Sequence, residues 1–358
     1  MKKVLLAMSG GTDSSVAAIL LQQDNYQVEG ITFRSYDSIS KGCMERENGC
    51  CSVDTLFEAK QLAKTLGFPH RIIDSRRDFK DTVIKNFISE YLKGRTPNPC
   101  VVCNTTIKWG SIAEIARAEE FDYIATGHYA QVLEENGRFF LRKGKDRVKD
   151  QTYFLWTLTQ DNLAHSLFPL GELVKDEVRE IAREHGYEKI ATKKESQEIC
   201  FVTDNNYRTF LKENIENVDE KIKEGDFLDT SGKVLGRHKG YPFYTIGQRK
   251  GLNIALGHPA YVTKLDPQNN TVTLGKRDEL NSREMWVEDL NMMKYASIEG
   301  EMEAICKIRY NSEGILSRLT QHGDRIKVEF YEDAWAITSG QSAVFYEGDD
   351  VIGGGIIV

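Results

Sequence analysis

The chain of 358 residues is 40% hydrophobic and 28% charged, and its formal net charge is −7 at pH 7. These values are ordinary for a soluble globular protein of two or three domains. No apolar run is long enough to cross a bilayer, which excludes a membrane-spanning chain. The acidic balance excludes a uniformly basic surface, so a nucleic-acid partner would need a local basic patch.

The first half of the chain alternates apolar runs with helical patterns. We expect a buried strand at residues 4–6 and a helix from residue 16, then strands at 28–33, 70–74 and 123–126 and helices at 54–66, 78–92 and 107–119. Strands that alternate with helices of this length predict an α/β fold with a parallel sheet and right-handed crossovers. Ligands of such sheets bind beyond the carboxyl ends of the strands.

The seven cysteines are an odd number in a chain with no secretory signal, because its N-terminal apolar stretch is cut short at Ser9. We therefore expect a cytoplasmic protein, without membrane association, whose cysteines serve thiol or metal chemistry rather than a disulfide framework. Cys43, Cys50 and Cys51 lie in a polar stretch without a second paired cluster nearby, which favours a surface loop over a zinc site.

A glycine-rich turn, AMSGGTDSSV at residues 7–16, joins the first strand to the first helix. Gly10 and Gly11 let backbone N–H groups approach an anion closely, and the helix N-terminus adds its dipole. Neighbouring hydroxyls supply further donors, whereas Asp13 suits a magnesium ion or an ordering role. Because no Gly-Lys-Ser/Thr follows, the turn predicts a phosphate cradle that is not a Walker A loop.

The segment SGGTDSS at residues 9–15 resembles the signature of the PP-loop ATP pyrophosphatases, which bind ATP, adenylate a substrate and release pyrophosphate. The resemblance implies ATP and Mg²⁺ as cofactors and an N-terminal domain of the adenine nucleotide alpha hydrolase-like fold. It implies nucleotide-binding roles for Ala7, Met8, Ser9, Gly10, Gly11, Thr12, Asp13, Ser14, Phe33 and Gly127. The loop alone leaves the substrate open.

A second dense stretch, GRTPNPCVVCNTTIKW, covers residues 94–109. Pro97 and Pro99 predict an extended segment, and a helix is expected from about Thr105. Cys100 and Cys103 would then lie near a helix N-terminus, whose dipole favours the thiolate. Two small buried side chains are the plainer interpretation, but apolar packing does not need the surrounding Pro-Asn-Pro turn.

This stretch resembles one PP-loop family, the tRNA-specific 2-thiouridylases. Similar motifs follow in order: TGHYA at 126–130, KDQTYFLWTL at 149–158, SQEICFV at 196–202, YPFYTIGQRKGL at 241–252, GHPAYV at 257–262 and KIRY at 307–310. The resemblance implies a tRNA-uridine 2-sulfurtransferase. Such an enzyme replaces O2 of the wobble uridine, position 34 of Lys, Glu and Gln tRNAs, through an adenylated uridine with release of AMP and pyrophosphate.

The resemblance also implies the partners and the remaining site residues. The partners are tRNA and a sulfur donor, which is a cysteine desulfurase, a sulfur-relay protein or free sulfide. The implied catalytic residues are Cys103, Cys200 and Cys100. Substrate contacts fall on Asn98, Pro99, Cys100, His128, Lys149, Asp150, Gln151, Arg309, Tyr310 and Gln341.

One departure concerns Cys100, because the family usually has an aspartate there that contacts the target base. In the family's scheme Cys200 carries a persulfide and Cys103 releases its sulfur by forming a disulfide. The extra thiol opens an alternative in which Cys100, Cys103 and Cys200 bind a 4Fe–4S cluster, and zinc ligation or a redox disulfide also stays open.

The rest of the chain predicts two further parts. Amphipathic helices at 173–185 and 206–222 predict a small helical middle domain with Cys200 on a loop between them, and short alternating strands from residue 225 predict an all-β barrel. The expected domains are therefore 1–162 with the PP-loop, 163–224, which is mainly helical, and 225–358, a tRNA-binding barrel. Cys306 falls in an alternating run that predicts a core position.

Two other functions remain open from the sequence. One is a non-thiolating PP-loop paralogue that binds tRNA, because Cys100 alters the usual turn. The other is a different PP-loop adenylating enzyme, although no glutaminase or small-substrate domain is apparent. The preferred tRNA isoacceptors, the sulfur donor and the oligomeric state are not specified by the sequence.

Overall fold

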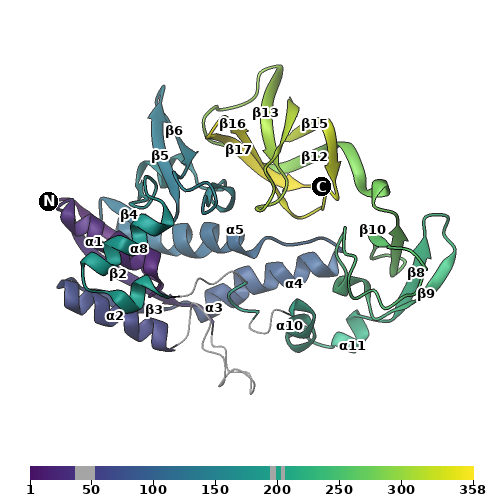
Figure 1. The fold of residues 1–358 in the computed structure, drawn as a ribbon, viewed down its shortest axis with the longest axis horizontal. Helices are drawn as coiled ribbons and strands as arrows, with labels where there is room; N and C mark the ends of the chain where they lie inside the picture. The colour runs from purple at the N-terminus through teal and green to yellow at the C-terminus, as the bar shows by residue number, and fades with distance from the viewer. Residues whose placement is uncertain (37–52, 194–198, 203–205) are drawn as a thin grey trace.

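The structure is a computed structural model and describes residues 1–36, 53–193, 199–202 and 206–358 (Figure 1). The predicted loop cysteines Cys43, Cys50 and Cys51 lie outside the described residues. No helix in the described part of the chain is both long and apolar enough to cross a membrane.

The N-terminal sheet is parallel, as the α/β pattern predicted. Its order is β3-β2-β1-β4-β7, with β1 Lys3–Ala7, β2 Gln27–Arg34, β3 His70–Asp74, β4 Tyr123–Thr126 and β7 Ser166–Leu167. The first four strands confirm the predictions to within two residues. The two-residue strand β7 is too short to give an alternating pattern and was not predicted.

Helices cover both faces of this sheet. Val4 and Leu6 pack toward α1 Thr12–Gln23, α2 Val53–Leu66 and α8 Lys175–Glu184, whereas Leu5 packs toward α6 Ile112–Ala118. Successive strand residues point to opposite faces, so an uninterrupted apolar run is what a sheet buried on both sides requires. This packing leaves the carboxyl edge of the sheet to the loops.

The remaining N-terminal helices run in two series. The predicted helix at 78–92 is present as α3 Arg76–Phe79, η2 Lys80–Ile84 and α4 Lys85–Leu92. The predicted helix at 107–119 begins earlier, as α5 Pro99–Cys103 and η3 Asn104–Ser111, and continues into α6. Proline at the first helical position has no intrahelical N–H to lose, which explains the earlier start.

The helical middle part is divided between two neighbours. It contains α7 Gln160–Ala164, α8, α9 Glu188–Ala191, α10 Tyr207–Asn214 and α11 Val218–Lys221. Helix α8 packs on α1, whereas Phe210 and Leu211 of α10 join the aromatic core around α3 and α4. The single helix expected at 206–222 is wrong, because Ile215 is extended and Asn217 is left-handed with φ +55°.

The all-β segment holds two sheets where one barrel was expected. The first has the order β10-β11-β8-β9, with β8 Gly225–Asp229, β9 Val234–His238, β10 Tyr261–Asp266 and β11 Thr271–Gly275. The second contains β12 Asn281–Met292, β13 Glu301–Lys307, β14 Ile315–His322, β15 Arg325–Trp335, β16 Ser342–Glu347 and β17 Asp350–Ile357, and it closes into a barrel through β12 and β17. Alternation alone could not separate the two sheets.

The barrel also takes up a hairpin from the N-terminal part of the chain. Strands β5 Ala130–Glu135 and β6 Arg138–Lys143 extend the barrel sheet beside β17, where Arg142 pairs with Asp350 at 2.6 Å. Short 3₁₀ turns, η4 Thr152–Phe154, η5 Tyr241–Phe243 and η6 Asp278–Leu280, complete the elements. Cys306 is fully buried in the barrel core, as predicted, and burial raises the pKa of its thiol.

Candidate active site

The glycine loop, residues 7–15, links β1 to α1 at the carboxyl edge of the parallel sheet. Gly10 has φ +70°, and a Cβ there would lie 2.4 Å from the Thr55 carbonyl oxygen, so only glycine fits. The first N–H groups of α1 have no intrahelical acceptors and face the turn, which makes the loop suited to an anion.

Hydroxyls inside the loop hold its shape. The Ser9 backbone N–H donates to Ser14 Oγ at 3.2 Å, and Ser15 Oγ donates to the Gly11 carbonyl at 2.8 Å. The serines therefore stiffen the turn.

The ends of the neighbouring strands approach the loop as predicted. A Cβ on Gly127, just beyond β4, would lie 2.8 Å from the Ser14 nitrogen, so the two segments touch through backbone. Phe33, near the end of β2, packs against the clusters on both sides of it. Because β1 lies between β2 and β4, all three segments meet at one edge.

A buried lysine that the sequence did not single out braces the loop. Lys175, in the first turn of α8, is 7% exposed, and its ammonium lies 2.7 Å from Asp13 Oδ1. The Tyr129 hydroxyl donates to the same oxygen at 2.8 Å. Asp13 thus takes the ordering role. An amphipathic helix pattern gives no signal for a buried lysine, although Tyr129 lies within the TGHYA motif.

A second unpredicted brace comes from the segment around α9. Lys193 Nζ donates to the Gly10 carbonyl at 3.0 Å and also pairs with Glu58. Thr12 Oγ1 donates to the Ile190 carbonyl at 2.6 Å. Residues nearly 180 positions later in the chain therefore close over the loop.

His128 lies behind the loop in a buried, uncharged environment. Its Nδ1 is 2.7 Å from Thr126 Oγ1 and its Nε2 is 3.3 Å from Lys108 Nζ. Burial, and after it the Lys108 ammonium, holds the pKa of His128 well below 6.5. At neutral pH the ring is a neutral packing and hydrogen-bonding group between Trp109 and Phe168.

The cysteine turn, residues 94–103, is gripped by the barrel. Gln341 Nε2 donates to the carbonyls of Thr96 and Pro97 at 3.1 and 2.9 Å, and the Thr96 N–H donates to the Ser339 carbonyl at 2.9 Å. A Cβ on Gly340 would lie 2.8 Å from the Thr96 oxygen. Gln341 was predicted to contact tRNA, and in the structure its side-chain amide positions this turn.

Cys100 and Cys103 lie inside the first helical turn, because α5 begins at Pro99 and not near Thr105 as expected. Their i, i+3 spacing puts them on one face of the helix. Cys100 is exposed, and Cys103 is half-buried against the aromatic core. Asn98 precedes the helix, and its carbonyl accepts from the Val102 N–H at 3.3 Å.

Cys200 is exposed on a short segment that is docked on the N-terminal part of the molecule. Its neighbour Phe201 is 1% exposed, with its ring centroid 5.6 Å from that of Phe79 and 5.2 Å from that of Phe87. The ring centroid of Tyr36, just beyond β2, lies 6.4 Å from that of Phe201. The segment carrying Cys200 and the helix carrying Cys103 therefore border the same core, at the β2 end of the sheet edge.

The described residues contain no group of three or more histidine, cysteine or carboxylate side chains placed to hold a metal ion. The predicted grouping of Cys100, Cys103 and Cys200 as iron ligands is therefore not found among them. The segments on both sides of Cys200 lie outside the described residues.

The KDQ segment lies between the loop and the barrel. Asp150 is 6% exposed and accepts from Thr152 Oγ1 at 2.8 Å and from the Gly144 N–H at 3.2 Å. Gln151 Oε1 accepts from the Tyr129 N–H at 3.1 Å, and Lys149 is half-exposed. Burial raises the pKa of Asp150. Asp150 and Gln151 thus shape the backbone, and Lys149 is partly exposed to solvent.

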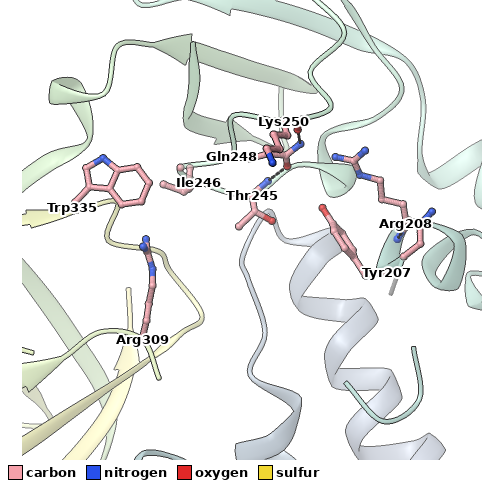
Figure 2. Close-up of a pocket in the computed structure, with 10 residues that line it drawn as sticks. Tyr207, Arg208, Thr245, Ile246, Gln248, Lys250, Arg309 and Trp335 are labelled. Carbon is pink, nitrogen blue, oxygen red and sulfur yellow. Dashed lines mark hydrogen bonds between the residues drawn. The ribbon is translucent and has the colours of Figure 1, made fainter. Parts of the chain in front are cut away.

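Arg309 and Tyr310 project from the barrel beyond β13. The Arg309 guanidinium lies 5.3 Å from the Trp335 ring centroid and donates to the Ala336 carbonyl (Figure 2). The Tyr310 ring lies 4.5 Å from that of Phe154, whose carbonyl accepts from Asn104 at 2.9 Å. The pair therefore connects the barrel to the residue after Cys103.

Three family models match consecutive parts of the chain. A tRNA methyl transferase HUP domain matches residues 2–204, a tRNA methyl transferase PRC-barrel domain matches 208–276, and an aminomethyltransferase beta-barrel domain matches 282–357. The passage from the second model to the third coincides with the change of sheet between β11 and β12.

Curated relatives are similar over almost the whole length. A tRNA-specific 2-thiouridylase MnmA of Amoebophilus asiaticus is 51% identical over 99% of this chain and 95% of its own length. The proteins of the same name from Cytophaga hutchinsonii and Salinibacter ruber are 51% and 48% identical, over 99% of this chain and 97% and 94% of their own lengths.

Proposed function

We propose that this chain, which belongs to the family of tRNA-specific 2-thiouridylases, replaces O2 of the wobble uridine of a tRNA with sulfur in an ATP-dependent reaction. The tRNAs are of the Lys, Glu and Gln type, and the reaction takes place in the cytoplasm. Its partners are the tRNA and a sulfur donor, which is a cysteine desulfurase, a sulfur-relay protein or free sulfide.

ATP binds at the glycine loop in this proposal. The backbone of Gly10 and Gly11 and the first turn of α1 would receive the phosphates, and Phe33 and Gly127 would flank the nucleoside. Support comes from the close approach of Gly127 to the loop, which leaves the edge lined by backbone. Mg²⁺ would neutralise the charge on the phosphates, beside the carboxylate of Asp13.

Adenylation prepares the uridine for substitution. O2 of uridine is a poor leaving group, so its attack on the α-phosphate of ATP, with pyrophosphate departing, converts it into one that leaves as AMP. The N–H groups of the loop would stabilise the charge that develops on pyrophosphate. Lys193, on the Gly10 carbonyl, and Lys175, on Asp13, keep this loop in place.

Sulfur transfer then uses two thiols. The terminal sulfur of a persulfide on Cys200 attacks C2, a C–S bond forms, and AMP leaves with O2. The Cys103 thiolate attacks Cys200 Sγ, the S–S bond to the transferred sulfur breaks, and its electron pair stays on that sulfur as 2-thiouridine. A thiol reductant must then reduce the Cys103–Cys200 disulfide. Cys100, Asn98 and Pro99 would line the base, with Lys149, Arg309 and Tyr310 on the tRNA side, and the expected contacts His128, Asp150 and Gln151 would support them from within the protein.

The three-cysteine 4Fe–4S cluster stays an alternative that rests on residue types. Cys100, Cys103 and Cys200 would be its ligands, but no such group is placed among the described residues, so we derive no step through it. Iron and labile sulfide measured on anaerobically purified protein, with Cys100→Ala as the variant, decide the point. Iron that is lost together with activity in Cys100→Ala would establish the cluster.

The observation that carries the proposal is that the core bordered by Cys103 and by the Cys200 segment reaches Tyr36 and Phe33, at the sheet edge that also bears the glycine loop. Thiols and a phosphate cradle share one edge. The test is nucleoside mass spectrometry of tRNA incubated with the protein, ATP and a persulfide donor. We expect 2-thiouridine only when ATP is present.

The same experiment separates the competing functions. A tRNA-binding paralogue would bind tRNA without tRNA-dependent release of pyrophosphate. A different PP-loop adenylating enzyme would release pyrophosphate with a small acceptor rather than with tRNA. Transfer of a methyl group, the activity named in two of the family models, would add carbon rather than sulfur to the nucleoside.

A further inference from the structure

A basic and aromatic hollow lies between the barrel, the four-stranded sheet and α10. It has a volume of about 720 Å³, and its walls come from three distant stretches of chain: α10, residues 245–250, and the barrel residues Arg309 and Trp335. Figure 2 shows Trp335 and Ile246 on one side, Tyr207 and Arg208 on the other, and Arg309 beside Trp335. We call this hollow the basic pocket.

The charge of the basic pocket is opposite to that of the whole chain. Its lining contains Arg208, Lys250 and Arg309 and no acidic residue, whereas the chain has a net charge of −7. Among the described residues, Arg208 makes no ion pair with a carboxylate, and its guanidinium lies over the rings of Tyr207 and Tyr244 at 6.0 and 5.5 Å. Such a local basic patch is what the acidic composition required of a nucleic-acid-binding protein.

Two buried polar atoms in the lining have no hydrogen-bond partner in the described structure, Tyr207 Oη and Trp335 Nε1. Buried polar groups are nearly always paired, so an unpaired one needs an explanation such as a missing ligand. Trp335 Nε1 donates, and Tyr207 Oη both donates and accepts. Both atoms are themselves buried, so they lie behind the exposed wall of the pocket and not on it.

The aromatic walls are held rigidly. Tyr207 is stacked on Tyr91 of α4 with a centroid distance of 4.8 Å and an interplanar angle of 13°. The guanidinium groups of Arg309 and Arg277 lie 5.3 and 5.6 Å from the Trp335 ring centroid. Gln248 fixes the loop between them, since it accepts from the Thr245 N–H and donates to the Lys250 carbonyl. A preformed aromatic surface lets a base stack without ordering the protein first.

The basic pocket is linked to the cysteine turn by consecutive residues. Arg309 lines the pocket, and the next residue, Tyr310, packs on Phe154, which binds Asn104 beside Cys103. Tyr91 leads directly into the turn through the Gly94 N–H, which donates to the Tyr91 carbonyl at 3.0 Å. The pocket and the cysteine turn therefore border one continuous packed region of the protein.

We propose that the basic pocket binds one unpaired nucleotide of the tRNA other than the modified uridine, with its base against Trp335 and its phosphate against Arg208 and Lys250. Single-stranded RNA is recognised by stacking on aromatic side chains combined with cationic contacts to the backbone. The inference rests on the proposed function for its choice of RNA. It adds a second contact that fixes where the anticodon loop lies.

The first test is equilibrium binding of labelled tRNA to full-length variants. Trp335→Leu should weaken binding about tenfold, and Trp335→Phe, which keeps a stacking ring, should restore most of it. Arg208→Gln should weaken binding and lower the slope of log affinity against log salt by about one. Arg237→Gln is the matched control, because Arg237 is an exposed arginine on β9 paired with Asp226 and should leave tRNA affinity unchanged.

The second test locates the nucleotide. tRNA transcripts that each carry one abasic nucleotide in the anticodon loop, outside the wobble position, are bound to wild type and to Trp335→Leu. At one position the abasic nucleotide should lower the affinity of the wild-type protein for tRNA about tenfold. The same transcript should not lower the affinity of the Trp335→Leu variant below its value for intact tRNA. Losses that add at every position would overturn the proposal. So would binding of AMP or UMP that depends on Trp335 while tRNA affinity does not, since the pocket would then hold a free nucleotide.

The binding readout keeps the two hypotheses apart. If wild type binds tRNA through Trp335 but forms no 2-thiouridine, the proposed function fails and the basic pocket stands. If 2-thiouridine forms normally and the Trp335→Leu variant binds tRNA like wild type, the pocket fails and the proposed function stands. Thermal midpoints of both Trp335 variants show whether a loss reflects a displaced barrel, because Trp335 also contacts Gly247 and Tyr261.

Discussion

The glycine loop and the cysteine turn lie at the same end of the parallel sheet but are held by different forces. The glycine loop is braced by charge: Lys175 on Asp13, and Lys193 on the Gly10 carbonyl. The barrel braces the cysteine turn by neutral hydrogen bonds from Gln341 to Thr96 and Pro97, and the ion pair of the turn, Arg95 with Glu90 of α4, does not involve the barrel.

The difference matches what each segment is proposed to hold. A loop that receives a polyphosphate gains from nearby ammonium groups, which also offset the charge of Asp13. The barrel therefore positions the segment that leads into Cys100 and Cys103.

The largest expected effect is the loss of sulfur transfer without loss of ATP cleavage when a thiol is removed. Cys200→Ser and Cys103→Ser should each lower 2-thiouridine formation by at least about 1000-fold, because no persulfide is formed or released. Release of pyrophosphate from ATP in the presence of tRNA should persist, since the glycine loop is intact. Cys306→Ala is the control, because that thiol is buried in the barrel core and should affect stability rather than sulfur transfer. Loss of pyrophosphate release in the two serine variants would contradict this division.

The charged brace is tested by Lys175→Met. The change leaves the partly exposed Asp13 carboxylate without its ion pair and should lower the free energy of unfolding by about 1–3 kcal/mol. The KM for ATP should rise, while the affinity for tRNA stays. Lys145→Met is the matched control, because Lys145 pairs with Glu177 on the same helix but is half-exposed. Equal effects of both variants on KM for ATP would show that Lys175 acts through general charge alone.

The neutral brace is tested by Gln341→Ala. Loss of both hydrogen bonds to the turn should slow 2-thiouridine formation by about tenfold and lower the free energy of unfolding by about 1–2 kcal/mol, with the KM for ATP unchanged. Gln321→Ala provides the control, since Gln321 also joins two backbone groups of the barrel, Ile298 N–H and Gly323 carbonyl, away from the turn. If Gln321→Ala slows thiolation as much, the grip on the turn is not the cause.

The smallest expected effect is on the pH dependence of stability and comes from the buried imidazole of His128. The folded pKa of His128 lies below its unfolded value near 6.5, so its contribution to stability is complete above pH 6.5 and is lost as the pH falls below it. Between about pH 7 and pH 5.5 the free energy of unfolding should fall by about 1 kcal/mol less in His128→Gln than in wild type. His258→Gln, at an exposed position, is the control variant, and its free energy of unfolding should follow the same curve against pH as that of wild type. Identical profiles for wild type and His128→Gln would contradict a neutral buried imidazole.

The sequence predicted the parts of this arrangement that depend on consecutive residues. SGGTDSS gave the glycine loop, and the alternation of apolar runs gave β1, β2, β3 and β4. The start of α5 was misplaced, because Pro97 and Pro99 were both interpreted as excluding a helix, whereas Pro99 occupies its first turn. Local patterns therefore identified most elements, but they misplaced the starts of α1 and α5, missed β7, joined α10 and α11 into one helix and did not separate the two C-terminal sheets.

The remaining features depend on residues far apart in the chain. Lys175 reaches Asp13 across 162 positions, and Gln341 reaches Thr96 across 245. Gln341 was expected to contact tRNA, and Lys175 was not singled out because most lysines are exposed to solvent. Hydrogen bonds between residues far apart in the chain leave no signal in the local sequence pattern. The basic pocket draws on three distant stretches, so none of its cations stood out from a charge count of the sequence.

The most direct test of the central claim is the stoichiometry of a single turnover. Protein preloaded with persulfide is mixed with a limiting amount of unmodified tRNA and ATP, and pyrophosphate, AMP and 2-thiouridine are counted together. The account predicts one of each per tRNA thiolated, and none without tRNA. 2-Thiouridine formed without ATP consumption, or pyrophosphate released equally without tRNA, would contradict it.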